Sequence, residues 1–334
     1  MKDLYNLYEG ILRDIENGLK SNIRTEDLAD KYSLSNTHLR RLFKYEFGQS
    51  IGSYIRSRKL ASSIEELKTT DKNILDIALD YGFEYEQSYI RSLKNELGVT
   101  PNKLRKACEK VKINPSLRLL DNNMLVNMNG FKYELWQDKQ MGNPSMFLKG
   151  EGLIKCKWDD INYINFRSGK SFDETKTHSQ LGPIDVDYGF CFNSKCDSWR
   201  GIYGWTVDPL IEFYIVENGN LNEYLNELPK KIADINGEKY YVFEKKCLNQ
   251  PSVKGVQSFK EYWSVRADKR SNGVVPVSEH FNTWEKMGME LGKMFEISVA
   301  IVGYQNSGNA EIYRNLVSIG DTIFGSKGDH FVSL

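Results

Sequence analysis

The chain has 334 residues, of which 40% are hydrophobic and 27% charged, and its 45 basic and 45 acidic residues leave a formal net charge of zero. This length predicts two domains or one large one, and the zero net charge excludes any argument for a nucleic-acid or membrane partner from overall charge alone. Residues 1–112 hold 20 Lys and Arg against 17 Asp and Glu, a net charge of +3, and the remainder holds 25 against 28, or −3.

Cysteine usage and hydropathy indicate the cellular compartment in which we expect the protein. The five cysteines are Cys108, Cys156, Cys191, Cys196 and Cys247. An odd number without a CxxC motif favours free thiols over a zinc site or a disulfide framework, and we expect neither a metal nor a cofactor. The N-terminal stretch MKDLYNLYEGILRDIENGLK has no signal-peptide pattern, and no run of 18 apolar residues occurs. We therefore expect a cytoplasmic protein with no membrane partner.

Residues 1–112 begin with a helical pattern. Apolar residues recur at helical spacing from the N-terminus. Thr25 precedes a short segment with acidic residues in its first turn, which is favourable at a helix start. Ser35 precedes a second short helix that Gly48 ends, and a longer helix is predicted from about 51 to 67.

The same pattern then recurs about 50 residues later. A short helix ends at Gly82, another is predicted over about 86–97, and Pro101 suits the start of a last helix. Two short helices joined by a tight turn, present twice, predict an all-α domain with two helix-turn-helix units over residues 1–112. Periodicity alone leaves a plain helical bundle open.

The second half has a different residue pattern. Residues 113–128 are predicted to be a linker. From residue 129 to 318 the chain alternates short, aromatic-rich strand patterns with Gly, Asn and Asp clusters, which predicts an all-β jelly-roll sandwich. One helix interrupts it, with Phe281, Trp284 and Met287 on one face and Gly292 at its end. Residues 319–334 are predicted to be a tail.

The first half resembles the AraC-type helix-turn-helix regulators over residues 24–106. The resemblance rests on LADKYSLSNTHLRRLFKYEFGQSIGSYI and ILDIALDYGFEYEQSYIRSLKNELGVTPNKLR. It implies that one helix of each unit enters the major groove of double-stranded DNA. The residues that fall where this family contacts DNA are Thr37, Arg40, Arg41, Gln87, Ser88 and Arg91. Each of them is also compatible with an ordinary solvated surface residue.

The second half resembles glycoside hydrolase family 11, the jelly-roll xylanases, over residues 130–312. The segments that carry the resemblance are GFKYELWQD, YGWTVDPLIEFYIVEN, NQPSVKGVQSFKEYWSVR, HFNTWEKMGMELG and GYQNSG. The resemblance implies two curved sheets that hold a xylan chain in a cleft, and a thumb loop at 249–253.

The resemblance also assigns the reacting groups. The family is a retaining one, with a nucleophilic glutamate and an acid/base glutamate about 5–5.5 Å apart. The nucleophile position matches Glu212, but the acid/base position is Val302, which cannot exchange a proton. Two positions that support the nucleophile are altered to Cys247 and Glu261. We expect no catalytic residue, with Glu212 a relic and the chain not an enzyme, and we keep Glu296 as the alternative acid.

The residues implied to bind sugar are better preserved. They are Trp136, Trp199, Tyr203, Glu212, Tyr214, Pro251, Ser252 and Tyr304. A lone Trp in a β-sandwich is more often a packing residue, yet these positions align with one cleft. Asn162 is a weaker match because the local spacing is one residue short.

These observations predict a DNA-binding transcription regulator with a xylanase-like domain that binds a xylo-oligosaccharide as effector without cleaving it. Two alternatives stay open. One is an intracellular endo-1,4-β-xylanase with an altered acid/base; the other is a regulator that uses the β-domain only for dimerisation. Whether the protein is a homodimer also stays open.

Overall fold

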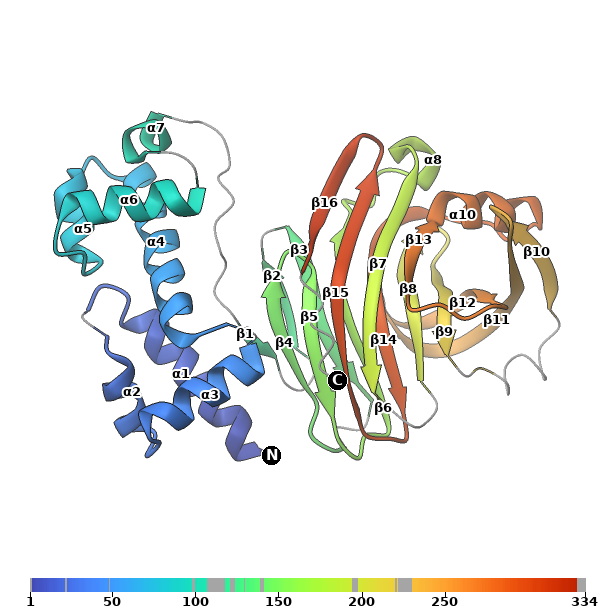
Figure 1. Cartoon of the computed structure of the whole chain (residues 1–334). Coiled ribbons are helices and arrows are strands. Elements are labelled where there is room, and N and C mark those ends of the chain that lie inside the picture. The colour runs from blue at the N-terminus through green and yellow to red at the C-terminus, as the bar shows by residue number, and fades with distance from the viewer. Residues whose placement is uncertain are drawn as a thin grey trace. The chain divides into compact units, whose positions relative to one another are not determined.

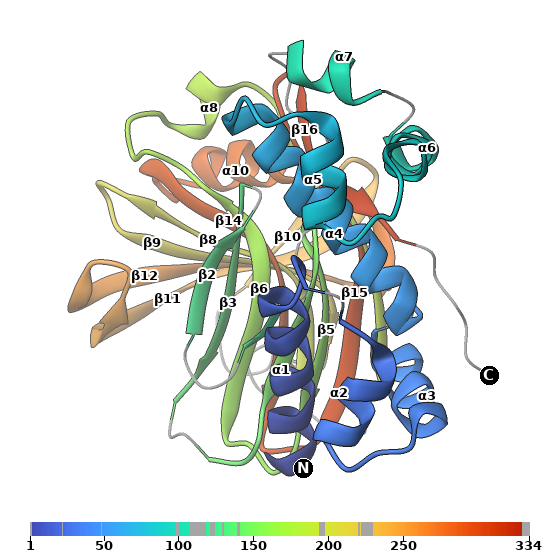
Figure 2. The ribbon, with the colours of Figure 1, turned by 90° about the vertical axis from the view of Figure 1, so that its left-hand side faces the viewer.

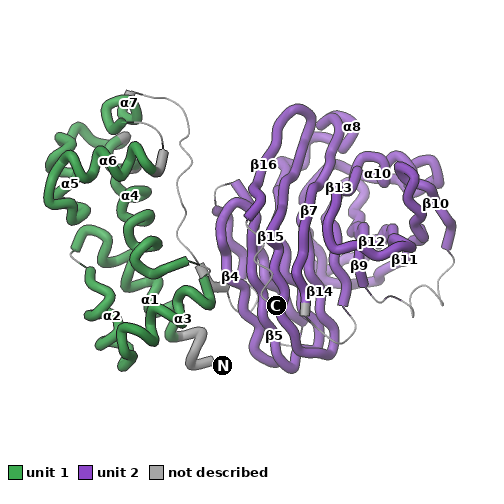
Figure 3. Tube along the Cα trace, viewed as in Figure 1, with its two compact units in different colours: residues 1–118 green, residues 119–334 purple. Residues whose placement is uncertain are grey.

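The computed structural model describes most of the chain (Figure 1). The residues described are 2–21, 23–47, 49–97, 100–106, 118–120, 124–128, 130–138, 141–193, 198–219, 221 and 230–328. Cys108, Cys196 and residues 113–117 of the predicted linker lie outside them. The chain divides into two compact units, residues 1–118 and 119–334 (Figure 3).

Unit 1 is all-α. Its helices are α1 (Lys2–Asn17), α2 (Thr25–Lys31), α3 (Asn36–Phe47), α4 (Ile51–Thr69), α5 (Ile74–Asp80), α6 (Glu86–Leu97) and α7 (Pro101–Lys106). The long helix α4 runs from the group formed by α1, α2 and α3 to the group formed by α5, α6 and α7 (Figures 1 and 2). The predicted double helix-turn-helix arrangement is therefore confirmed.

Local capping explains where these helices begin. The Ser35 side chain accepts a hydrogen bond from the backbone N–H of His38 at 3.2 Å, at the start of α3. Asn73 does the same for Asp76 at 2.7 Å, at the start of α5. Side-chain oxygens at this position satisfy backbone donors that the first turn leaves unpaired. Helices α3 and α5 therefore begin at polar caps.

Unit 2 is a β-sandwich. Its strands are β1 (Arg118–Leu120), β2 (Met124–Met128), β3 (Phe131–Gln137), β4 (Ser145–Gly150), β5 (Leu153–Trp158), β6 (Tyr163–Ser171), β7 (Ile184–Asn193), β8 (Ser198–Val207), β9 (Ile211–Gly219), β10 (Lys231–Ile235), β11 (Glu238–Ser252), β12 (Gly255–Arg266), β13 (Asn272–Pro276), β14 (Lys293–Tyr304), β15 (Gly308–Ile319) and β16 (Thr322–Lys327). The nine-stranded sheet has the order β10-β11-β12-β9-β8-β14-β6-β3-β2. The smaller sheet has the order β1-β4-β5-β15-β7-β13, with β16 paired to β15.

The strands reach further than the sequence analysis predicts. Both β1 and β2 fall within the predicted linker, and β16 falls within the predicted tail. Pairing to distant strands explains this, because β2 joins β3 at the edge of the large sheet and β16 adds to β15. Residues 329–334 of the predicted tail lie outside the described residues.

Helix α10 (Val277–Lys286) packs against the inner face of the large sheet. The Phe281 and Trp284 side chains are fully buried, and Trp284 Nε1 donates to Ser264 Oγ at 2.9 Å. The helix ends at Lys286 and not near Gly292 as predicted. Gly288 takes a φ of +82° just past the end, a left-handed conformation that terminates helices at the first suitable glycine. The structure also contains a one-turn helix, α8 (His178–Leu181).

The two faces of the large sheet have different roles. Alternate residues of β9 point to opposite faces, so Phe213 and Ile215 join the core between the sheets while Tyr214 and Val216 belong to a second apolar cluster. We call the second face the aromatic face. It carries Trp199, Tyr203, Trp205, Tyr214, Phe243, Phe259 and Trp263. These rings are only 2–8% exposed, so they form a second packed cluster on the face of the sheet that does not meet the main core.

Candidate functional sites

Glu212 lies on β9, partly buried among the rings of the aromatic face. Tyr203 on β8 donates its hydroxyl proton to Glu212 Oε1 at 2.9 Å, and Trp205 Nε1 donates to the Tyr203 oxygen in turn. Burial, followed by the negative charge of Glu261, raises the pKa of Glu212 to about 8. This carboxyl group is therefore mostly protonated at neutral pH.

Glu261 is the direct neighbour of Glu212. The parallel pairing of β12 and β9 places the two residues opposite each other. Glu261 accepts hydrogen bonds from the Cys247 thiol at 2.9 Å and from Trp263 Nε1 at 3.0 Å. Lys245 Nζ is 3.4 Å from Glu261 Oε2. Burial, followed by the hydrogen bond to Glu261, raises the pKa of the Cys247 thiol to about 12, so the thiol remains protonated and acts as a donor.

Val302 lies on β14 and is 2% exposed. Its Cα partners are Trp199 on β8 and Asn165 on β6. The side chain joins the same apolar cluster as Tyr203 and Tyr214. The position predicted for the proton donor is thus occupied by a buried apolar group within the cluster that surrounds Glu212.

Glu296, the alternative proton donor, is held in ion pairs with basic residues. It is fully buried and forms ion pairs with Lys132 and, at 3.2 Å, with Arg167. Burial favours a higher pKa, but the Arg167 and Lys132 charges outweigh it and hold the pKa of Glu296 below its ordinary value. A carboxyl group held ionised by two cations is a poor proton donor.

The predicted sugar-stacking residues share one row across the large sheet. The Cα partners in neighbouring strands run Trp136, Asn165, Val302, Trp199 and Gly219. Cross-strand partners project to the same face, so the structure brings Trp136 and Trp199 to the aromatic face together. Trp199 contacts Tyr214 edge to face at 5.3 Å between ring centroids.

The predicted thumb loop is the tip of the hairpin between β11 and β12. Pro251 pairs with Val256, and the Ser252 hydroxyl donates to the Gly255 carbonyl at 2.6 Å. Next to them, Lys254 forms an ion pair with Glu174 at 2.5 Å. This tip therefore contacts the loop after β6 through exposed charged groups.

Tyr304 and Asn162 lie at the end of β14 and beside it. Tyr304 is 46% exposed and pairs with Tyr163 in the sheet. The Asn162 amide donates to the Asp138 carboxylate, so that its side chain is held by a local contact. Asn162 thus has a structural partner that its sequence position did not indicate.

Sequence reasoning missed two groups that support the site. The Arg167 guanidinium lies 4.6 Å from the Tyr203 ring centroid, and its charge counters the rise in the pKa of Glu212. Trp263 stacks on Tyr214 at 3.9 Å with an interplanar angle of 13°. The sequence signal available for Arg167 was an arginine directly after the apolar Phe166 in a predicted strand region.

The six predicted DNA-contact residues lie on two helices of unit 1. Thr37, Arg40 and Arg41 are exposed on α3. Gln87, Ser88 and Arg91 are exposed on α6. Their exposure leaves both helices free to present side chains to base edges.

Arg40 differs from its neighbour Arg41 in its contacts. Its guanidinium is 3.6 Å from Glu26 and donates to the Thr25 hydroxyl at 3.3 Å. Both partners belong to α2, so Arg40 ties the two helices of the first unit together. This contact competes with any contact that Arg40 makes to DNA.

Among the described residues, no helix has the length and apolarity needed to cross a membrane. Within the same ranges, no three His, Cys, Asp or Glu side chains are grouped so that they could hold a metal ion.

A double helix-turn-helix unit joined to a sandwich with a glutamate among aromatic rings defines a DNA-binding protein with a glycoside hydrolase-like domain. Residues 28–107 match the family described as Helix-turn-helix domain, which confirms the AraC-type resemblance. Residues 128–313 match the family described as Glycosyl hydrolases family 11. The chain belongs to glycosyl hydrolases family 11.

Curated relatives support this membership. The chain is 42% identical over 204 residues to endo-1,4-beta-xylanase A of Bacillus pumilus, which covers 61% of this chain and 88% of that protein. It is 44% identical over 199 residues to a bifunctional xylanase/deacetylase of Pseudobutyrivibrio xylanivorans, covering 60% and 33%. It is 41% identical over 203 residues to endo-1,4-beta-xylanase A of Thermoclostridium stercorarium, covering 61% and 31%. The chain thus spans about a third of the length of the last two.

A solved structure has the same sandwich. The family 11 xylanase from Neocallimastix patriciarum aligns with a TM-score of 0.56 and 29% identity, over 61% of this chain and 99% of that one. The expectation that the chain is not an enzyme is wrong. Relatives 41–44% identical are named as xylanases, and the fold is the one that such enzymes use, which argues for glycosidase activity.

Proposed function

We propose that this protein is a cytoplasmic DNA-binding transcription regulator whose family 11 domain binds xylo-oligosaccharides on its aromatic face as effectors. The observation that carries the proposal is the presence, in one chain, of a double helix-turn-helix unit and a sheet face built from sugar-stacking rings around Glu212. A helix-turn-helix unit binds DNA. Because the sugar-binding domain belongs to the same chain, sugar binding can be linked to DNA binding.

The chemistry of the aromatic face suits a pyranose chain. Trp136 is partly exposed and offers a flat apolar ring, Trp199 is 6% exposed further along the same row, and tyrosine hydroxyls add polar groups near them. Glu212, protonated at neutral pH, both donates and accepts hydrogen bonds. A mostly apolar site with a few directed polar groups is the usual design of a small-ligand site.

Thermodynamic linkage states what coupling between sugar binding and DNA binding requires. A sugar changes DNA affinity only if it binds more tightly to one of two conformations that differ in DNA affinity, and the coupling is reciprocal. Typical coupling energies of about 1–3 kcal/mol change affinity about 5- to 150-fold. The proposal therefore requires that DNA and sugar alter each other's affinity by the same factor.

The test uses the full chain and DNA duplexes selected with it from a random library. Calorimetry with xylotriose to xylohexaose should give heat of binding, and Trp136→Ala should remove most of it because a stacking ring is lost. Ile323→Ala, which trims an exposed apolar side chain on β16 in the other sheet, is the matched control. Duplex affinity measured with and without xylohexaose should then change at least fivefold.

Two results would overturn the effector role. Absence of heat at millimolar sugar would leave the β-domain as a dimerisation module, which light scattering would reveal. Binding of sugar without any change in duplex affinity would separate carbohydrate recognition from regulation.

The DNA side makes its own prediction. Arg41→Ala or Arg91→Ala should weaken binding to a selected duplex by about 1–3 kcal/mol, since a bidentate contact to a base is lost. Specificity at one base position should relax in the same variant. Arg13→Ala, an exposed change on α1 outside both helix-turn-helix units, should leave affinity nearly unchanged. Equal losses in all three would mean that charge alone binds the DNA.

A second candidate function is hydrolysis of xylo-oligosaccharides at Glu212. The identity of 41–44% to named xylanases favours it, as does the retained carboxyl group held by Tyr203. Release of reducing sugar from xylohexaose by the wild-type chain, abolished in Glu212→Gln, would support it. Equal release by both proteins would exclude Glu212 as the nucleophile.

A further inference from the structure

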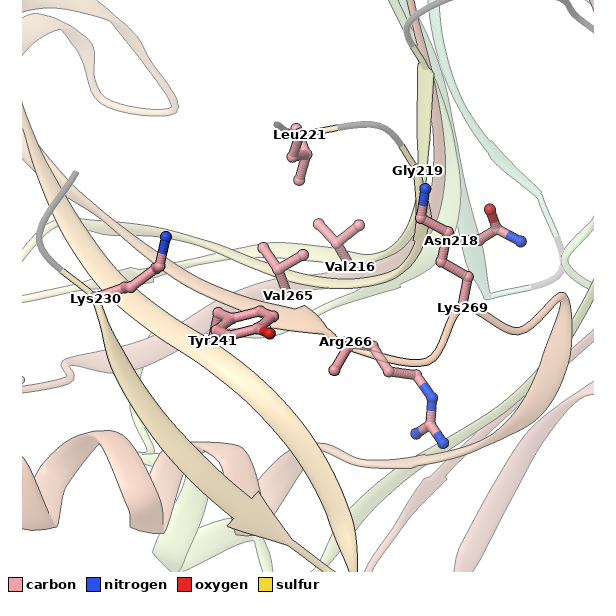
Figure 4. Close-up of a pocket in the computed structure, with 10 residues that line it drawn as sticks. Val216, Asn218, Gly219, Leu221, Lys230, Tyr241, Val265, Arg266 and Lys269 are labelled. Atoms are coloured by element: carbon pink, nitrogen blue, oxygen red, sulfur yellow. The ribbon is translucent and has the colours of Figure 1, made fainter. Parts of the chain in front are cut away.

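A cavity of about 350 Å³ lies at one end of the aromatic face. Tyr241, Val265 and Val216 lie side by side along its floor, with Leu221 across from them (Figure 4). The three floor residues are Cα partners on β11, β12 and β9. This row is the next one along from Phe243, Trp263 and Tyr214, so the cavity continues the aromatic face.

The cavity also lies at the end of the row that begins at Trp136. Gly219, the last residue of that row, lines it together with Asn218. Five adjacent strands at about 4.8 Å spacing put about 19 Å between Trp136 and Gly219. One oligosaccharide of several units can therefore extend from Trp136 across Trp199 to the cavity.

The charged side chains that line the cavity are basic. Lys230 and Lys269 line it. The Lys230 and Lys239 ammonium groups lie 5.9 and 5.6 Å from the centroid of the Tyr241 ring. None of the described residues that line the cavity is acidic. Lys230, Lys239 and Lys269 are all exposed, and such a group of cations creates a local positive potential.

Arg266 also lines the cavity, but its charge is already compensated. Its guanidinium forms an ion pair with Glu238, and its Nη1 donates to the Tyr240 hydroxyl at 3.1 Å. Lys239 and Lys269, which are both exposed, are therefore the cations placed to meet a ligand. The floor is apolar and aromatic, which suits the face of a sugar ring, and the rim suits an anion.

We propose that this cavity is a subsite for an anionic sugar unit, a uronic acid carried by the oligosaccharide that lies on the aromatic face. The proposal rests on the proposed sugar binding and specifies the ligand: an acidic xylo-oligosaccharide is preferred to a neutral one. Tyr241 stacks on the uronic acid ring, and Lys239 and Lys269 attract its carboxylate.

The test is calorimetry on the full chain with two probes, xylotetraose and xylotetraose substituted with one glucuronic acid. The acidic probe should bind about fivefold more tightly at low salt, since exposed ion pairs contribute up to about that factor. The preference should shrink at high salt because solvent ions screen exposed charges. The double variant Lys239→Gln/Lys269→Gln should lose the preference yet keep its affinity for the neutral probe.

Controls separate this inference from the function on which it rests. Lys260→Gln removes an exposed lysine of β12 that pairs with Glu244 and should keep the preference. Failure of both probes to bind would refute the sugar site itself. Binding of both with equal affinity would refute only the acidic subsite. Glucuronate alone binding as tightly as the acidic probe would also overturn the proposal, because the cavity would then be a general anion site.

Discussion

Val302→Glu is expected to raise the turnover of xylohexaose by about 10²–10⁴-fold, the usual contribution of a positioned general acid or base. The wild-type residue is a buried valine in the cluster around Glu212, and an unactivated sugar leaving group needs a proton. A carboxyl group at this position would supply it. The measurement is reducing-sugar release with the wild type and the variant at matched concentration.

Three comparisons sharpen this experiment. Val302→Gln has nearly the same shape as the glutamate variant and no acid, so it should give no gain. Adding Glu212→Gln to Val302→Glu should abolish the gain, because the nucleophile is then missing. A xylobioside with a dinitrophenyl leaving group, which departs without a proton, should give about the same kcat/KM for dinitrophenolate release with the wild type and Val302→Glu, because only the later hydrolysis of the glycosyl-enzyme needs the base. No increase on xylohexaose would mean that another group already supplies the proton.

Glu261→Gln is expected to lower the pKa of Glu212 and to move the acid limb of the activity profile to lower pH. Glu212 must be ionised to act as a nucleophile, and with a pKa of about 8 only about one molecule in a hundred is ionised at pH 6. Activity should therefore rise with pH up to about 8. Removing the neighbouring negative charge should lower that pKa by roughly 1–2 units and raise activity at pH 6 about tenfold or more.

The charged and titratable groups around Glu212 define the expected size of the change. Tyr203, Tyr214 and Arg167 act to lower its pKa, whereas burial and Glu261 raise it. Burial is the largest cause, so the pKa in the variant should remain above 4.5.

Kinetics on the dinitrophenyl xylobioside and ¹³C NMR of the carboxyl group both report this titration. Glu244→Gln removes a carboxylate that faces Lys260 on the other side of the sheet and should leave the profile in place. An unchanged profile in Glu261→Gln would show that Glu261 does not control Glu212.

The sequence predicts the helices of unit 1 well because their signals are local. The Ser35 and Asn73 side chains accept hydrogen bonds from backbone N–H groups only three residues further on. Helix α6 has the predicted bounds. Helix α10 was predicted too long because its apolar face continues to Met287, whereas the backbone turns at Gly288. Long-range pairing could not be predicted from spacing. The strands β1, β2 and β16 are defined by partners far along the chain.

In the candidate site, too, the residues could be predicted from the sequence but some of their contacts could not. The family resemblance identified Glu212, Val302 and the aromatic residues by position. It placed Glu261 near the nucleophile but did not indicate that Glu261 is the direct β-sheet partner of Glu212, nor that Arg40 is tied to Glu26. Such contacts depend on register between strands and on the packing of helices, which a single sequence does not encode in any local pattern.

The Lys254–Glu174 contact has a consequence for conformational change in the β-domain. The rings of the aromatic face belong to strands that are hydrogen-bonded to neighbouring strands on both sides. The backbone of these strands therefore has little freedom to move when a ligand binds. The tip of the β11–β12 hairpin instead meets its surroundings through Lys254, which pairs with Glu174 and lies 5.4 Å from the centroid of the Phe295 ring, and a surface ion pair is worth at most about 1 kcal/mol. We therefore expect the hairpin tip to move more readily than the strands when a ligand binds, because little free energy opposes its displacement.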